Sequence, residues 1–185
     1  MNFKTAITVM ILATLASFNA SAQQKQDTSV QQQSQNDEGP NVEIDEYHDW
    51  VLRCDNSDSG GTSSCLLFER LLKKDTNQLV LQASVALPKG AKKSPILIFT
   101  LPLGIYLPDG ASLQVDGSKG VSLQINRCLK QGCIAVLSIQ DALLGQLRNG
   151  KTATVSVSQS EGKTINFALS LDGFKAGFKA LEEST

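Results

Sequence analysis

The chain is poor in histidine, the side chain that enzymes use most often as a general base. His48 is the only histidine among its 185 residues. No Gly-x-Ser-x-Gly segment accompanies it, so the nucleophile motif of many hydrolases is missing. A cysteine–histidine pair would need a free thiolate, and the four cysteines can instead pair off. His48 also fits a structural position at the entrance of a strand, beside Trp50. We therefore predict no catalytic residues, with a hydrolase that uses His48 as the alternative.

The cysteines also lack the spacings of common metal and redox sites. Ten residues separate Cys54 from Cys65, and four separate Cys128 from Cys133. Structural zinc sites usually carry two tight spacings of about two to four residues, and thiol–disulfide oxidoreductases normally carry Cys-x-x-Cys. The carboxylates offer no metal cluster, since the aspartates in question fall in predicted turns, where they cap their own backbone: Asp55, Asp58, Asp75, Asp109 and Asp116. We expect neither a metal nor a cofactor.

An excess of positive charge is missing too, since 17 basic and 18 acidic residues give a formal net charge of −1. A protein that binds the phosphate backbone of nucleic acids needs clustered basic residues. The small clusters that are present are expected in solvated turns, with an anion or polysaccharide site as the alternative: Lys73 and Lys74, then Lys89, Lys92 and Lys93. We predict no nucleic-acid partner.

The longest apolar run, residues 6–18, is too short for a membrane span, which requires roughly 20 apolar residues. Lys4 precedes this run, and Ala20-Ser21-Ala22 follows it with the small-x-small pattern of a signal peptidase site. Residues 1–22 are therefore expected to be a signal peptide that is cleaved between Ala22 and Gln23. The alternative is a membrane anchor. Cleavage would remove Lys4, change the net charge from −1 to −2, and leave an exported chain without a transmembrane segment.

Residues 23–41 are expected to be a disordered linker, because the stretch up to Pro40 contains seven glutamines and only one large apolar residue, Val30. Such a composition cannot bury enough apolar surface to offset the entropy lost on ordering. The remaining residues, 42–185, are long enough to form one domain with a substantial core.

Alternating apolar and polar residues dominate this domain, and this period is typical of half-buried strands. Strands are expected at residues 50–54, 64–72, 79–87, 96–101, 112–115, 121–127, 134–139, 153–158 and 165–171. Two prolines and two glycines make residues 101–110 an extended connection across the edge of the core. Short helices are expected at about residues 141–148 and 173–183, the first ending in a left-handed cap at Asn149-Gly150. The pattern predicts an antiparallel β-sandwich with Trp50 in its core.

Export would place the four cysteines in an oxidising compartment, where an even number favours disulfides. Local pairing, Cys54–Cys65 with Cys128–Cys133, is favoured because the ends of a short loop meet about tenfold more often than those of the long one. Crossed pairing would constrain the unfolded chain more, so stability alone leaves the other two connectivities open.

Several motifs together resemble the invasion-associated locus B family. They are Asp49-Trp-Val-Leu-Arg-Cys, Ser64-Cys-Leu-Leu-Phe-Glu, Ile98-Phe-Thr-Leu-Pro-Leu-Gly-Ile-Tyr-Leu-Pro, the Cys128–Cys133 turn and Leu169-Ser-Leu-Asp-Gly-Phe. The resemblance covers about residues 50–181 and implies an immunoglobulin-like β-sandwich that is exported to the bacterial periplasm or outer envelope.

The resemblance also implies a role in host-cell invasion, and it supplies no catalytic residues. The expected partner is a protein or other macromolecule in the envelope or on a host cell. The alternative is a periplasmic housekeeping factor that supports envelope integrity.

Overall fold

The computed structural model describes residues 41–56, 64–89, 94–160 and 162–184. These residues belong to the unit Glu38–Thr185 and form eleven strands, two α-helices and one short 3-10 helix. The predicted signal peptide, most of the predicted linker, Asp58, Lys92 and Lys93 lie outside the described residues. None of the described helices is long and apolar enough to span a membrane.

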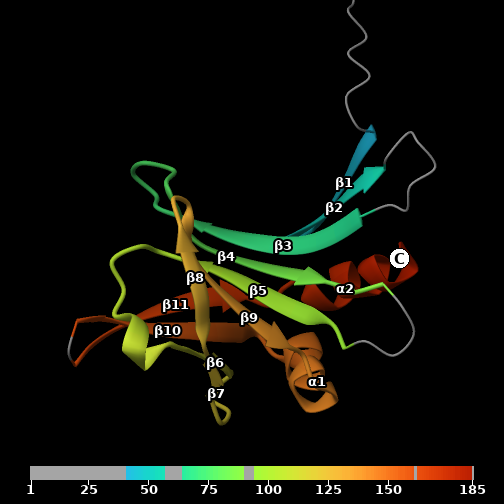
Figure 1. Cartoon of the computed structure of the whole chain (residues 1–185). Coiled ribbons are helices and arrows are strands. Elements are labelled where there is room, and N and C mark those ends of the chain that lie inside the picture. The colour runs from blue at the N-terminus through green and yellow to red at the C-terminus, as the bar shows by residue number, and fades with distance from the viewer. Residues whose placement is uncertain (1–40, 57–63, 90–93, 161, 185) are drawn as a thin grey trace, which may run out of the picture. The chain divides into compact units, whose positions relative to one another are not determined.

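Two antiparallel sheets form the domain (Figure 1). In spatial order, the seven-stranded sheet contains β1 (Asn41–Tyr47), β2 (Trp50–Asn56), β3 (Ser64–Leu72), β4 (Leu79–Ala86), β5 (Ile96–Leu101), β9 (Gly132–Ser138) and β8 (Ile125–Leu129). The four-stranded sheet contains β11 (Lys163–Ser170), β10 (Thr152–Ser160), β6 (Ala111–Val115) and β7 (Val121–Leu123). The predicted antiparallel β-sandwich is confirmed.

The core lies between the inner faces of the two sheets, where the inward residues of the central strands are buried. On β4 and β5 the buried apolar residues are Leu81, Ala83, Val85, Leu97, Phe99 and Leu101, and those of the opposite sheet include Leu113, Val115, Val155 and Val157. Connections between the sheets run through the 3-10 helix η1 (Leu107–Asp109) and through α1 (Asp141–Asn149). The C-terminal helix α2 (Phe174–Glu183) packs against β1, β2 and β3.

Trp50 is the central side chain of this core, as predicted. Only 2% of it is exposed, and its ring meets that of Phe174 edge-on with 4.9 Å between the ring centroids. Phe174 in turn lies against Phe178 one turn along α2. The indole Nε1–H donates a hydrogen bond of 2.9 Å to the carbonyl oxygen of Ser170 at the end of β11. Trp50 therefore joins the first part of the chain to both the second sheet and the last helix.

The structure adds a strand that the sequence reading missed. β1 pairs along its whole length with β2, and none of the other described strands pairs with its second edge. Its charged residues Glu43, Asp45 and Glu46 are exposed, and so is Ile44. Because β1 is an edge strand that buries little on either face, its apolar alternation is limited to Val42 and Ile44, which is too short a pattern to reveal a strand.

The expectation of one strand at residues 121–127 is wrong. β7 ends at Leu123 in the four-stranded sheet, and β8 begins at Ile125 in the seven-stranded sheet. The chain therefore changes sheet at Gln124, as strands do at the corners of some sandwiches. Leu123 is buried and Ile125 packs against the core, so the apolar pattern continues across the corner and hides it.

The expected left-handed cap of α1 is wrong as well. Gly150 ends the helix with φ −78° and ψ 172°, which is an extended conformation. A Cβ at this position would lie 2.6 Å from Cγ1 of Val115 and 2.8 Å from the carbonyl oxygen of Gln146. Glycine is required here because the backbone approaches its neighbours closely.

Gly173, just before α2, is required for two reasons. Its φ of 89° lies in the left-handed region, and a Cβ would overlap the carbonyl oxygen of Tyr47 in the β1–β2 turn. The contact fixes the start of α2 beneath the turn that leads into Trp50.

Replacing Gly173 with alanine should therefore destabilise the domain by about 3 kcal/mol or more, because the left-handed conformation costs roughly 1–2 kcal/mol and the clash adds to it. Gly117→Ala is a matched control, since Gly117 has φ 75° and open space around it. Urea denaturation of both variants measures the difference. Equal losses of stability would show that the contact with Tyr47 has no role.

Candidate functional site

The four cysteines form two disulfides that each join directly opposite residues of neighbouring strands. Cys54 on β2 is bonded to Cys65 on β3, and Cys128 on β8 is bonded to Cys133 on β9. Between the second pair only Lys130 and Gln131 lie outside the strands. Because all four sulfurs are bonded, this structure offers no thiolate for catalysis or for a metal.

His48 lies in the tight turn between β1 and β2, with φ 52°. Its Nδ1 is 3.6 Å from Oδ2 of Asp172, beyond the usual length of a hydrogen bond, and about 70% of each side chain is exposed. A catalytic imidazole is normally held by its carboxylate partner in a fixed orientation. His48 is not fixed in this way. It lies in the β1–β2 turn, whereas the disulfides join β2 to β3 and β8 to β9.

Glu69 is a buried carboxylic acid that sequence reasoning missed. It is 6% exposed, and on β3 it points inward between the core-facing residues Leu67 and Leu71. Its Oε1 accepts a hydrogen bond of 3.0 Å from the backbone N–H of Ser170, whose carbonyl oxygen accepts the Trp50 hydrogen bond. The sequence signal for this buried acid is the position of Glu69 between Leu67 and Leu71, where the alternation of β3 calls for an apolar residue.

The second oxygen of Glu69, Oε2, has no hydrogen-bond partner among the described residues. Burial raises the pKa of this carboxyl from 4.5 to about 7, and the negative charge of Asp49 adds to the rise, while the hydrogen bond from Ser170 opposes it. Glu69 is therefore a single acid that joins the two sheets. Its one hydrogen-bonded contact is structural.

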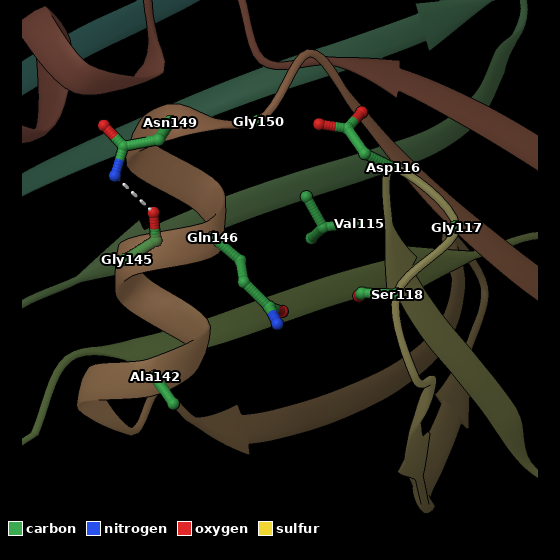
Figure 2. A pocket seen from close by; sticks show the side chains of 9 residues that line it. All are labelled: Val115, Asp116, Gly117, Ser118, Ala142, Gly145, Gln146, Asn149 and Gly150. Carbon is green, nitrogen blue, oxygen red and sulfur yellow. Dashed lines mark hydrogen bonds between the residues drawn. The ribbon is translucent and has the colours of Figure 1, made fainter.

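A groove of about 580 Å³ lies between α1 and the turn that joins β6 to β7 (Figure 2). On the helix side the wall is made by small residues, Ala142 and Gly145, while Gln146 extends across the groove towards Ser118. Asp116 stands at the other side, but both of its oxygens already accept backbone hydrogen bonds of 2.9 Å, from Lys151 and Thr152.

The polar groups of this groove suit binding better than catalysis. Asn149 donates a hydrogen bond of 2.8 Å to the carbonyl oxygen of Gly145, and Gln146 and Ser118 also line the groove. The Ser118 hydroxyl is buried and has no partner among the described residues. Neither group is an effective acid or base near neutral pH. The groove can hydrogen-bond a ligand.

The outer faces of the two sheets differ in chemistry. On the four-stranded sheet a hollow of about 180 Å³ is lined largely by hydroxyl groups, from Ser112, Ser122, Ser156, Ser158 and Thr164. On the seven-stranded sheet the outward positions of β5 are Ile96, Ile98 and Thr100, and Val136 on β9 is 42% exposed. The outer face of the four-stranded sheet is thus polar at this hollow, whereas that of the seven-stranded sheet has an apolar strip on β5 and β9.

Comparison with known proteins gives a single answer. A family model described as invasion associated locus B protein matches residues 50–182. An invasion protein B homologue of Brucella abortus (strain 2308) is 30% identical over 140 residues, which are 75% of this chain and 79% of that protein. Invasion protein B of Bartonella bacilliformis is 28% identical over 139 residues, 73% of this chain and 72% of that protein.

A solved structure agrees at the level of the fold. The crystal structure of invasion associated protein B from Bartonella henselae superposes with a TM-score of 0.66, and the match covers 76% of this chain and 95% of that one. The sequence identity is 24%.

The raised pKa of Glu69 predicts a pH-dependent stability. The unfolded chain loses the Glu69 proton near pH 4.5 and the folded chain only near pH 7, so the stability contributed by the proton is lost as pH rises through this window. Glu69→Gln keeps the acceptor for Ser170 and cannot ionise. It should raise the melting temperature above pH 7 by a few degrees and flatten its pH dependence.

Melting curves of both proteins across this window test the prediction. Glu43→Gln is the control, because Glu43 is an exposed carboxylate on β1 and its replacement should leave the slope of the wild type. If the melting temperature of the wild type does not fall between pH 4.5 and 7 relative to that of Glu69→Gln, the raised pKa of Glu69 is contradicted.

Proposed function

The chain belongs to the invasion associated locus B family, and from this premise we propose that it is an exported, non-enzymatic protein that acts by binding a macromolecule during host-cell invasion. The names of its relatives as invasion proteins support the role. The signal-like residues 1–22 support export to the periplasm or outer envelope. The partner is a protein or other macromolecule of the envelope or of a host cell.

The observation that carries a binding function is the apolar outer face of the seven-stranded sheet. The strand register aligns a row across five strands: Val51, Phe68, Ser84, Ile98 and Val136. We call this row the Ile98 face. An antiparallel sheet with one face in water normally alternates polar residues outward. An apolar outward row therefore marks a surface for a partner.

Part of the Ile98 face is already covered within the domain. The guanidinium of Arg70 lies 4.6 Å above the ring of Phe68 and donates a hydrogen bond of 2.9 Å to Gln82, whose amide donates to Ser84. This chain of polar side chains shields Phe68 and Ser84. It leaves Ile98 and Val136 as the apolar centre that a partner would cover.

Val136→Lys should therefore reduce host-cell entry when the variant replaces the wild type in a deletion strain, by about fivefold or more, because a charge would have to be buried at the interface. Thr154→Lys is the matched control, since Thr154 is also a β-branched residue on an inner strand but lies on the outer face of the other sheet. Entry assays with equal envelope levels of each variant measure the effect. Unchanged entry with Val136→Lys would overturn the role of this face.

The deletion strain also separates invasion from the housekeeping alternative. Normal entry into host cells together with increased sensitivity to detergent would favour a factor that supports envelope integrity. Loss of entry with normal detergent resistance favours the proposed function.

The hydrolase alternative has its own test in His48→Ala. Because His48 is exposed and its Nδ1 lies 3.6 Å from the carboxylate of Asp172, the substitution should change neither stability nor entry, within about 0.5 kcal/mol for stability. Denaturation and the entry assay are the measurements. A loss of entry with unchanged folding would revive a catalytic role for His48.

A further inference from the structure

The exposed apolar residues of the domain are concentrated at one end of the sandwich. Among the described residues, eight large apolar side chains are exposed. Six of these lie on three neighbouring connections and form what we call the leucine end: Leu72, Leu79, Leu103, Tyr106, Leu107 and Leu129. Single exposed apolar residues are ordinary, whereas a concentration of them marks an interaction site.

Strand register places the leucines at the same end of the seven-stranded sheet. Leu72 and Leu79 are paired at the end of β3 and the start of β4. Leu103 follows the last residue of β5, Leu101, which is paired with Cys133. Leu129 belongs to the tip of the β8–β9 hairpin, because it pairs with Gly132 next to that cysteine. Figure 1 shows the three connections at one end, opposite α1 and α2.

The apolar side chains lie at strand ends and in the connections between them. Leu103 is 56% exposed, Leu107 50% and Leu129 48%. The long connection is held against the other sheet by a hydrogen bond of 2.7 Å from the Tyr106 N–H to the carbonyl oxygen of Ser158. The leucine end is therefore a set of projecting tips on a supported base.

Basic residues lie next to these leucines in the chain. Lys73 and Lys74 follow Leu72 directly, Lys130 follows Leu129, and Arg127 lies one residue before the Cys128 bridge. The three connections contain three basic residues, Lys73, Lys74 and Lys130, and two acidic residues, Asp75 and Asp109, so their net charge is +1 in a chain whose net charge is −1. Asp75 is 3.3 Å from Lys73, which leaves Lys74 and Lys130 against the single negative charge of Asp109. Arg127 adds a positive charge nearby on β8.

We propose that the leucine end docks onto the surface of an anionic lipid bilayer. The cores of protein–protein interfaces are depleted in lysine, whereas lysine beside leucine suits a lipid surface. There the apolar tips enter the headgroup region, and the lysine stems lie along them with their charges at the phosphates.

Vesicle binding tests the proposal on the exported form that begins at Gln23, because residues 6–18 would themselves bind lipid. The probes are vesicles of phosphatidylglycerol with phosphatidylethanolamine and vesicles of phosphatidylcholine alone. We expect partitioning onto the anionic vesicles that weakens with added salt. Leu103→Ser with Leu129→Ser should reduce it by about tenfold or more, and Lys74→Gln with Lys130→Gln by about fivefold or more.

Ile44→Ser is the matched control, because Ile44 is 60% exposed but lies on β1, away from these connections. It should bind as the wild type does. Unchanged circular dichroism and melting of the leucine variant would show that it remains folded. Equal binding to both vesicle types, or unchanged binding by the leucine variant, would overturn the proposal. A self-association in solution that the leucine variant abolishes would also overturn it, by showing a second copy as the occupant.

The lipid surface is independent of the Ile98 face. Val136→Lys should keep vesicle binding, and the double leucine variant should keep a correctly folded Ile98 face. A failure of vesicle binding with an intact effect of Val136→Lys on entry would therefore refute the leucine end alone.

Discussion

The hydrogen bond from Trp50 to the backbone of Ser170, together with the Trp50–Phe174 contact, is the constraint on which the rest of the structure depends. It joins the seven-stranded sheet, the end of the four-stranded sheet and the start of α2 at one point. The carboxylate of Glu69 accepts a hydrogen bond from the N–H of the same Ser170. Both backbone groups of Ser170 are therefore hydrogen-bonded to side chains of the opposite sheet. Gly173 then lets the helix begin close beneath the β1–β2 turn.

Most of the fold could be predicted from local pattern, because each inner strand buries one face and therefore alternates. β4 is the clearest example, with Leu81, Ala83 and Val85 all buried. Where a constraint other than burial determines the residue, prediction from local pattern fails. β1 buries little, Gln124 changes sheet without breaking the apolar pattern, and Gly150 is needed for a contact with Val115 that local sequence does not show.

The surfaces were harder to predict than the fold for the same physical reason. The Ile98 face combines residues from Val51 to Val136, and only the register of five strands aligns them. The leucine end unites three connections that are far apart in the chain. By contrast, the low histidine content and the spacing of the cysteines can be read directly from the sequence. Sequence alone could therefore argue against the common catalytic and metal sites. The groove beside α1 depends on the hydrogen bonds that the backbone N–H groups of Lys151 and Thr152 donate to Asp116. No sequence motif predicts these bonds.

The separation of 120 residues between Trp50 and its acceptor has a consequence for the order in which the chain acquires its structure. The hairpins from β1 to β5 join neighbours in sequence and can close as the chain emerges, whereas long-range contacts are slow to form. Ser170 and Phe174 come near the end of synthesis, so the indole stays open to water until almost every other element exists. The sole tryptophan is thus a native fluorescent reporter whose burial times the completion of the fold.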